Sequence, residues 1–431
     1  MKQFSVVIMG AGNRGGRYAR IMADHKDKFK VVAVADPRQA DREYVQSLHG
    51  FGNEGCFNSW QELLAQPKMA DIAVIATVDN MHTAPALKAI ELGYNLLIEK
   101  PVAQTPEECV QIAEAARKKG VKVLVCHVLR YTNFYGTIKQ LLMDGTIGEV
   151  VSADLAEAIG HTHFAHSYVR GNWHKEKETT PMLLAKSCHD LDIVQWLLDK
   201  PCQRVHSFGS LVHFRAENAP EGAPERCDDA CPVYNSCPYN CHKFYLRLNL
   251  TTKSQWPSVI TAGMRKEHTP TPKEIMKALE VKDYGRCVYH MDNDVVDHQV
   301  VSMEFQGGTT ATLTVNAFNC GGRYIRLYGT NGELFAHMKD EEIQVFSFDK
   351  GHYTVPVKKV DEHITGGHGG GDDGIIEEMY EYFSDNYTGF RAADIQVSVR
   401  NHMIGFAAEQ ARHNGTVVSV EEYMKEKGLT I

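Results

Sequence analysis

The chain has 431 residues, enough for two or three domains, because single hydrophobic cores stop growing beyond about 250–300 residues. Hydrophobic residues make up 43% of the chain and charged residues 23%, a balance that excludes wholesale disorder. The 54 acidic residues outnumber the 46 Lys and Arg and give a net charge of −8. This balance argues against nucleic acid as a partner and favours a small-molecule ligand.

The N-terminus places one Lys before a short apolar run that leads directly into glycines, MKQFSVVIMG. A signal peptide needs a longer apolar stretch and a cleavage site, and no segment approaches the ~20 apolar residues of a membrane span. We therefore expect a cytoplasmic protein that does not bind membranes. In that reducing compartment its 11 Cys should be thiols or metal ligands.

The first 127 residues alternate short apolar runs with helical patterns. The predicted strands cover residues 4–10, 30–37, 71–77, 94–101 and 121–127. A capping box at Thr105, with Pro at the first helical position, predicts a helix that runs to about Lys119. Because these strands lack polar alternation and are separated by helices, we predict an α/β domain with a doubly wound parallel sheet over residues 1–127.

From about residue 130 the strand-like runs follow one another without helices between them. These runs cover residues 149–158, 204–214, 300–305, 310–318, 324–329 and 343–348. Helical patterns cover residues 134–144 and 182–198 and resume from about residue 375. We predict a C-terminal α+β domain over residues 128–431 with a mainly antiparallel open sheet. Within it, residues 215–242 are interpreted as an irregular, Cys-rich insertion.

A glycine-rich turn follows the first predicted strand and opens a helix. Its predicted cofactor contacts are Gly10, Gly12, Asn13, Arg14 and Gly15. The glycines permit a tight turn and let backbone N–H groups approach a pyrophosphate. Asp36, 21 residues after Gly15, stands where an acid accepts hydrogen bonds from ribose hydroxyls. We therefore predict a Rossmann domain that binds NAD, with NADP as the alternative because Arg14 and Arg38 lie close by.

Two further motifs carry residues suited to catalysis. Glu99-Lys100-Pro101 closes the strand at 94–101, and ligands bind at the carboxyl ends of such strands. Lys186 and His189 are three residues apart in the predicted helix 182–198, so they should share one face. Taken alone, the first motif is more often a solvated turn, and the second is more often a helix with a core histidine.

The order of these motifs resembles the Gfo/Idh/MocA family (glucose–fructose oxidoreductase, inositol dehydrogenase and rhizopine catabolism). The resemblance covers residues 1 to about 335. In the N-terminal part it rests on GAGNRG with Asp36, on Thr77, Asp79 and His82 in ATVDNMH, and on EKP at 99–101. Further along the chain it rests on Arg130-Tyr131, on the helix with His189, and on GTNGEL at 329–334. It implies a Rossmann domain followed by an open antiparallel sheet that pairs subunits. We therefore expect a homodimer or homotetramer.

The resemblance also implies hydride transfer between a sugar or polyol hydroxyl carbon and a nicotinamide cofactor. The catalytic candidates are Lys100, His189 and Lys186. The further cofactor contacts are Thr77, His82, Glu99 and Lys100, and the substrate contacts are Arg130, Tyr131, His163 and Tyr168. The chain departs from the family at Ala185, where many members carry Asp four residues before the His.

Two other functions fit the same residues. The first is a redox-neutral, NAD-dependent glycosidase, in which transient oxidation permits elimination of the aglycone and the hydride then returns. His163, His166 and Tyr168 in HTHFAHSY would supply extra acids or bases for it. The second is a sugar-sensing regulator without turnover, which the intact Lys100 and His189 disfavour.

Four cysteines in the insertion suggest a metal site. Cys227, Cys231, Cys237 and Cys241 lie within 15 residues, and zinc prefers four thiolate or imidazole ligands in a tetrahedron. We predict a structural zinc ion held by these four residues, with His213 or His242 as a substitute ligand. Four free thiols are the alternative.

Overall fold

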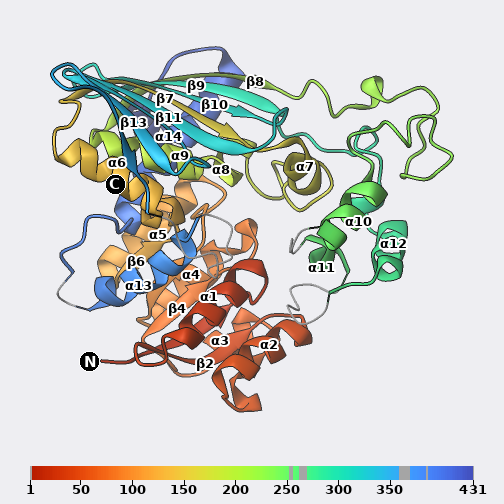
Figure 1. Cartoon of the computed structure of the whole chain (residues 1–431). Coiled ribbons are helices and arrows are strands. Elements are labelled where there is room, and N and C mark those ends of the chain that lie inside the picture. Colours follow the sequence, from red (N-terminus) through yellow and green to blue (C-terminus); the bar gives the residue numbers. More distant parts are fainter. Residues whose placement is uncertain (1, 252–255, 262–268, 359–368, 385–386, 431) are drawn as a thin grey trace.

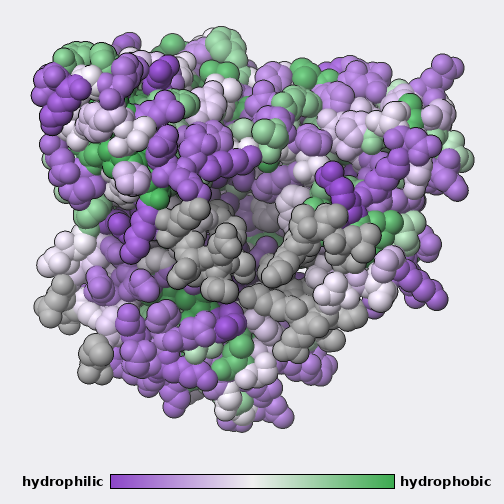
Figure 2. All heavy atoms as spheres, in the orientation of Figure 1, coloured by the Kyte–Doolittle hydropathy of each residue, from purple (hydrophilic) through white to green (hydrophobic). Residues whose placement is uncertain are grey.

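The computed structural model describes residues 2–251, 256–261, 269–358, 369–384 and 387–430. In Figure 1 the first strands and helices of the chain, β1 to α5, in red and orange, form a lower α/β body, and a broad sheet lies above it. A separate group of green helices stands beside both. The surface in this view is mainly hydrophilic and is hollowed between the lower body and the upper sheet (Figure 2).

The lower body contains a six-stranded parallel sheet in the order β3-β2-β1-β4-β5-β6. Its strands are β1 (Phe4–Met9), β2 (Phe29–Ala35), β3 (Cys56–Phe57), β4 (Ile72–Ile75), β5 (Asn95–Ile98) and β6 (Val123–Val125). Its helices are α1 (Asn13–Asp24), α2 (Gln39–His49), α3 (Trp60–Leu64), α4 (Thr83–Glu91) and α5 (Pro106–Lys119). The predicted doubly wound sheet is confirmed. Only the two-residue edge strand β3 was missed, because it is too short to leave a pattern.

The second sheet has nine strands in the order β14-β13-β12-β11-β7-β10-β9-β8-β15. The strands are β7 (Val150–Ala158), β8 (Cys202–Ser210), β9 (His298–Phe305), β10 (Thr310–Asn316), β11 (Gly322–Gly329), β12 (Gly332–His337), β13 (Glu342–Ser347), β14 (Gly351–Pro356) and β15 (Val418–Ser419). All neighbours are antiparallel except β7 and β10. The mainly antiparallel sheet is therefore also confirmed. Helices α9 (Cys188–Leu198) and α14 (Ile395–Asn414) pack against it, and α6 (Asn133–Met143) packs on α9.

The single helix predicted over residues 182–198 is wrong. The chain instead forms α8 (Met182–Ala185), a turn at Lys186 and Ser187, and then α9. The side chain of Ser187, at the N-cap of α9, makes no capping hydrogen bond, but Ser is disfavoured within a helix because its hydroxyl competes for backbone hydrogen bonds. Lys186 and His189 therefore do not share the face of one continuous helix.

The insertion is larger than predicted and has a small core of its own. Residues 211–240 contain only the short turn η5 (Ala216–Asn218), but α10 (Cys241–Thr251), α11 (Trp256–Thr261) and α12 (Pro272–Val281) follow. Their buried apolar side chains are Cys241, Phe244, Tyr245, Ile260, Ile275 and Leu279. These helices form the green group in Figure 1.

The C-terminal part of the chain returns to the first sheet. Helix α13 (Gly371–Phe383) buries Ile375, Ile376, Met379 and Phe383 in the cluster that contains β1, β2 and α1. The N–H of Val125 in β6 also donates to the carbonyl of Ala393. The final helix is α15 (Val420–Glu426). Residues far beyond the predicted division at 127 and 128 therefore also pack on the first sheet.

Within the described ranges, no helix is both long and apolar enough to cross a membrane.

A buried ion pair joins the end of the first sheet to the helices of the second. Arg130 in η3 (Val128–Tyr131) donates through Nε and Nη2 to the two carboxylate oxygens of Asp192 at 2.7 and 2.6 Å. Asn401 in α14 donates to the same carboxylate. Burial raises the pKa of Asp192, and Arg130 opposes this. The buried carboxylate of Asp192 thus joins η3, α9 and α14.

Replacing Arg130 by Met should lower the free energy of unfolding by about 3–5 kcal/mol, because it leaves Asp192 buried without its cation. Urea unfolding followed by circular dichroism measures the change. Arg20→Met is the control, since Arg20 pairs with Asp24 on the surface and should cost less than about 1 kcal/mol. Equal losses for the two variants would contradict the stabilising role of the buried pair.

Candidate active site

The glycine-rich turn has the shape that a dinucleotide requires. Gly10 has φ +86°, and a Cβ there would lie 2.5 Å from the carbonyl oxygen of Ala76. A Cβ on Gly15 would lie 1.8 Å from the carbonyl oxygen of Gly10, whereas one on Gly12 would meet only the end of the Arg38 side chain. Helix α1 begins after Gly12 with no side-chain cap and no acidic residue in its first turn. Its first N–H groups are therefore available to a pyrophosphate.

Asp36 lies directly beneath this turn. Its Oδ2 accepts a hydrogen bond from the N–H of Ala11 at 2.8 Å, and its Oδ1 accepts from the N–H of Arg38 at 2.9 Å. The guanidinium of Arg38 contacts Asp36 and also Asp41 at 2.7 Å. The carboxylate is thus fixed at the end of β2, where ribose hydroxyls would lie, and Arg38 is held by acidic partners.

Arg14 points into the protein rather than along the cofactor crevice. It donates to Glu99 Oε1 at 2.6 Å, to the hydroxyl of Tyr18 at 2.6 Å and to Asp372 Oδ1 at 2.7 Å. Burial alone would raise the pKa of Glu99, but Arg14 and Tyr18 outweigh it and lower that pKa. Arg17 also pairs with Asp372. Because these side chains bind each other, Arg14 and Glu99 can contact the cofactor only through their backbone N–H and C=O groups.

No sequence pattern singled out Asp372. It belongs to the glycine-rich segment 366–374, of which residues 366–368 lie outside the described residues. Asp372 is 358 residues away from Arg14 along the chain, so no local pattern could pair them.

His82 connects the turns that follow β4 and β5. Its Nδ1 lies 2.8 Å from the carbonyl oxygen of Pro101, and its Nε2 lies 3.1 Å from that of Thr77. The hydroxyl of Thr77 donates to the carbonyl of Met81. Both ring nitrogens of His82 are used within the protein, so we now expect His82 to shape the crevice rather than to hydrogen-bond the cofactor.

Lys100 reaches from the first sheet to the second body. It follows β5, and its Nζ donates to the carbonyl of Ala185, the last residue of α8, at 2.7 Å. Burial raises the pKa of the Cys188 thiol to about 12, although the charge of Lys100 opposes this. The ammonium of Lys100 therefore lies close to the first turn of α9, which also carries His189.

His189 belongs to a row of three buried imidazoles. The ring centroids of His189 and His127 are 6.0 Å apart, and those of His127 and His402 are 5.8 Å apart. His402 donates from Nδ1 to the carbonyl of Ser398 and accepts at Nε2 from the N–H of Val102, which defines a neutral tautomer. Burial, and then His127, lower the pKa of His402 to about 3. Neither His127 nor His402 was predicted as a site residue, because His127 ends a run that was interpreted only as a buried strand and His402 lies in no recognised motif.

Lys186 is part of a buried charge network. Its Nζ lies 3.5 Å from Glu157 Oε1. Glu157 in β7 is the cross-strand neighbour of Arg323 in β11 and pairs with it, and Arg323 donates to Asp190 at 2.8 Å. Burial lowers the pKa of Lys186, and the carboxylate of Glu157 opposes this. The network places two cations and two carboxylates between the sheet and the start of α9.

The predicted substrate contacts fall into two groups. Arg130 and Tyr131 are buried, Arg130 in its pair with Asp192, so the structure places both in the core rather than facing the hollow. Tyr168, in the π-helical turn η4 (Ala165–Val169), is close to Glu157 and Asp79: burial, followed by these two carboxylates, raises its pKa. The ring of His163 in α7 (His161–Phe164) lies 6.3 Å from that of Tyr168.

Trp173 links this group to the first body. Its Nε1 donates to Asp79 Oδ2 at 3.0 Å, and its ring lies 6.3 Å from that of Tyr168. Asp79 is in η2 (Asp79–Met81), directly after β4. His166, in the same turn η4 as Tyr168, contacts the hydroxyl of Tyr245 in α10 through its Nδ1 at 2.6 Å. Aromatic and acidic side chains from both bodies thus meet beside Lys100.

Comparison with known families agrees with this geometry. Residues 4–127 match the oxidoreductase family with an NAD-binding Rossmann fold, Gfo/Idh/MocA, and residues 139–420 match its C-terminal alpha/beta domain. The chain belongs to the Gfo/Idh/MocA family.

Similar sequences in this family include proteins named as an oxidoreductase, a hydratase and a dehydrogenase. The oxidoreductase YteT of Bacillus subtilis is 25% identical over 72% of both chains. The 2,7-anhydro-N-acetylneuraminate hydratase of Escherichia coli is 29% identical over 48% of this chain and 53% of its own, and inositol 2-dehydrogenase 1 of Saccharopolyspora erythraea is 28% identical over 46% and 56%. The chain therefore matches about half the length of the last two.

Solved structures in the family share the fold. The scyllo-inositol dehydrogenase of Lactobacillus casei with bound NAD(H) and scyllo-inositol has a TM-score of 0.64 at 16% identity, over 97% of this chain and 100% of its own. An Agrobacterium radiobacter oxidoreductase in complex with NAD⁺, L-tartaric acid and magnesium has a TM-score of 0.69 at 13% identity, over 98% and 100%.

The predicted zinc site is not supported. Among the residues that the structure describes, no three His, Cys, Asp or Glu are arranged to hold a metal ion. Instead, the guanidinium of Arg170 lies 3.8 Å from Cys227 Sγ, where a second cation would be repelled. The substitute ligands are also engaged, since His213 contacts the hydroxyl of Tyr289 and His242 that of Tyr234.

Replacing Asp36 by Ala should weaken NAD binding about tenfold or more, a change of about 1.4 kcal/mol. The variant loses the ribose acceptor that Ala11 holds in place, and it also loses the charge that repels a 2′-phosphate, so the preference for NAD over NADP should shrink. Titration calorimetry with both cofactors measures this. Asp24→Ala, which removes a surface carboxylate of α1, should bind like the native chain. An Asp36 variant that matched this control would show that the ribose lies elsewhere.

Proposed function

We propose that this chain is an NAD-dependent dehydrogenase of a sugar or polyol. The observation that carries the proposal is the contact between Lys100 and the carbonyl of Ala185. It brings the strand end beside the cofactor crevice to the end of α8, just before the helix that carries His189. When bound, NAD supplies the hydride acceptor. The open turn at Gly12 and the uncapped start of α1 fit its pyrophosphate, and the position of Asp36 favours NAD over NADP.

Lys100 is assigned to hold the reacting hydroxyl. An ammonium has three N–H donors, and Ala185 uses one of them, so others can reach a substrate oxygen. His189 is assigned as the general base that takes the hydroxyl proton. It lies in the first turn of α9, four residues after Ala185, whose carbonyl Lys100 contacts.

Lys186 is assigned a supporting role. Its partner Glu157 and the neighbouring Arg323 fix it beside the start of α9, where it adds positive charge as the substrate hydroxyl becomes an alkoxide.

The wall formed by His163, Tyr168 and Trp173 supports a cyclic sugar or polyol as the substrate. Such molecules have apolar C–H faces that pack on aromatic rings and hydroxyl edges that hydrogen-bond to carboxylates such as Asp79. The names of relatives point the same way, since they include inositol 2-dehydrogenase and levoglucosan dehydrogenase.

A second candidate is a redox-neutral elimination on a glycoside or anhydro sugar. It is favoured by the two relatives named 2,7-anhydro-N-acetylneuraminate hydratase, from Escherichia coli and Mediterraneibacter gnavus. In this reaction the hydride returns to the substrate, and the titratable side chains of His163 and Tyr168 would move the additional protons.

The cytoplasmic location and the homodimer or homotetramer stay predictions. Light scattering on the protein as it elutes from a size-exclusion column tests the oligomeric state.

His189→Ala and Lys100→Ala should each lower kcat at least about a hundredfold, since positioned proton transfer is worth about 10²–10⁴ in rate. Both variants should still bind NAD, because neither side chain forms the glycine turn. Turnover on a panel of aldoses, inositols and glycosides measures the loss, and calorimetry measures cofactor binding.

Lys88→Ala and His352→Ala are matched controls on the surface and should keep native turnover. A His189 variant with near-native turnover would rule out His189 as the base. Two readouts on the same panel separate the candidate functions: net formation of NADH indicates a dehydrogenase, and release of aglycone without net NADH indicates the redox-neutral reaction.

A further inference from the structure

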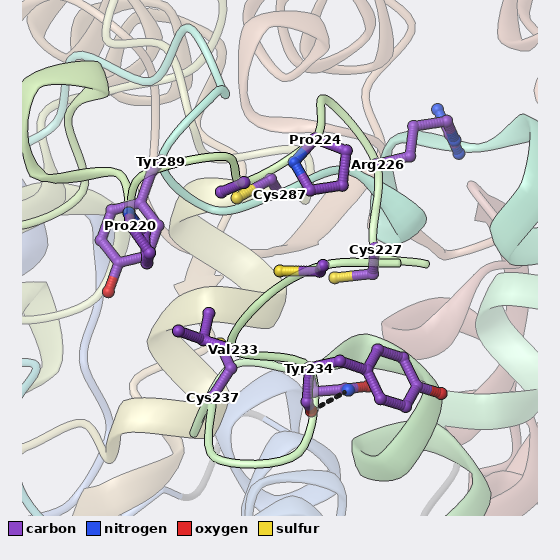
Figure 3. A pocket seen from close by; sticks show the side chains of 12 residues that line it. Pro220, Pro224, Arg226, Cys227, Val233, Tyr234, Cys237, Cys287 and Tyr289 are labelled. Atoms are coloured by element: carbon purple, nitrogen blue, oxygen red, sulfur yellow. Dashed lines mark hydrogen bonds between the residues drawn. The ribbon is translucent and has the colours of Figure 1, made fainter. Parts of the chain in front are cut away.

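A second group of reactive side chains lies in the insertion, outside the residues assigned to the nicotinamide crevice. Cys227, Cys231, Cys237 and Cys287 line one small cavity. In Figure 3 the sulfur of Cys227 points into the space between the labelled side chains. A fifth thiol, Cys241, lies at the first position of α10 and hydrogen-bonds to Cys227. All eleven cysteines of the chain are free thiols.

Cys227 differs from its neighbours in what surrounds its sulfur. It accepts hydrogen bonds from the thiol and from the backbone N–H of Cys241. Arg170 Nη2 lies 3.8 Å away, and this buried guanidinium is held in place by the carbonyls of Arg286 and Tyr239. A helix N-terminus and an adjacent Arg both stabilise a thiolate.

The pKa values follow this difference. The thiol of Cys241, and then Arg170 and the backbone N–H, lower the pKa of Cys227 below the usual range of a thiol. Burial raises the pKa of Cys237 and of Cys287, although both line the same cavity. Of these three thiols, only that of Cys227 has a lowered pKa.

We propose that Cys227 and Cys241 form a thiol–disulfide exchange site that reacts with low-molecular-weight disulfides. The proposal is independent of the function assigned to the nicotinamide crevice. It rests on the hydrogen-bonded sulfur pair, on the buried guanidinium beside Cys227, and on the cavity into which that sulfur points.

The exchange has two balanced steps. The thiolate of Cys227 attacks one sulfur of the disulfide RSSR; a bond forms between Cys227 and that sulfur, the S–S bond breaks, and RS⁻ leaves. RS⁻ takes the thiol proton of Cys241, whose sulfur then attacks Cys227 Sγ and displaces the second RS⁻. The two protein sulfurs are oxidised to a disulfide, and RSSR is reduced to two thiols. Excess thiol reverses both steps.

Alkylation rates test the nucleophile. The full-length protein is treated with iodoacetamide at about pH 6.5, and peptide masses are followed with time. Cys227 should be alkylated at least about tenfold faster than Cys237 and Cys287, because only a thiolate reacts. It should also react faster than Cys320, which is exposed and reports accessibility alone. Equal rates at Cys227 and Cys320 would overturn the proposal.

Bis(2-hydroxyethyl) disulfide tests the pair. In the native chain it should link the peptides of Cys227 and Cys241 and release two equivalents of 2-mercaptoethanol. Cys241→Ser keeps a donor for Cys227 but should trap the mixed disulfide on Cys227, whereas Cys287→Ser should behave like the native chain. A Cys241 variant that traps nothing would overturn the proposal.

Metal analysis of protein purified without chelator tests whether the cysteines bind a metal ion instead. Less than about a tenth of an equivalent of zinc or iron is expected. Near one equivalent, with Cys227 unreactive until a chelator is added, would show a metal site in place of the exchange site. Should a Cys variant fail to fold, the alkylation rates of the native chain still decide the question.

Discussion

The hydrogen bond from Lys100 to the carbonyl of Ala185 ties the cofactor side of the molecule to its substrate side. Its acceptor depends on the end of α8, because the last carbonyls of a helix lack partners within that helix. The same interruption starts α9, whose first turn carries His189. The positions of Lys100 and His189 thus both depend on one irregularity of two residues, Lys186 and Ser187.

The buried charges around this point explain why the irregularity is stable. An unpaired buried charge is costly, yet Lys186, Glu157, Arg323 and Asp190 form one connected network between the sheet and α9. Two of its members are cross-strand neighbours on β7 and β11. The second sheet therefore fixes the positions of Glu157 and Arg323. Their contacts with Lys186 and Asp190 in turn fix the turn between α8 and α9.

The sequence predicted features that local chemistry determines. The glycine turn, the buried parallel strands and the capping box at Thr105 each depend on residues that are neighbours in the chain, and the structure contains all of them. Features that depend on distant partners were missed or misread. The continuous helix over residues 182–198 was predicted because its apolar pattern continues through the turn at Lys186 and Ser187. The tetrahedron of cysteines was predicted without knowledge that Arg170 lies beside Cys227.

The return of α13 to the first sheet has a consequence for how the chain folds as it is made. Asp372, which pairs with Arg14, and the apolar face of α13 that covers the first sheet are synthesised 358 residues after Arg14. At about 5–20 residues per second this interval is roughly 20–70 s. During that time the nucleotide-binding body has left the ribosome but exposes the apolar surface that α13 will bury. The first body therefore emerges early but is completed only when nearly the whole chain has been translated.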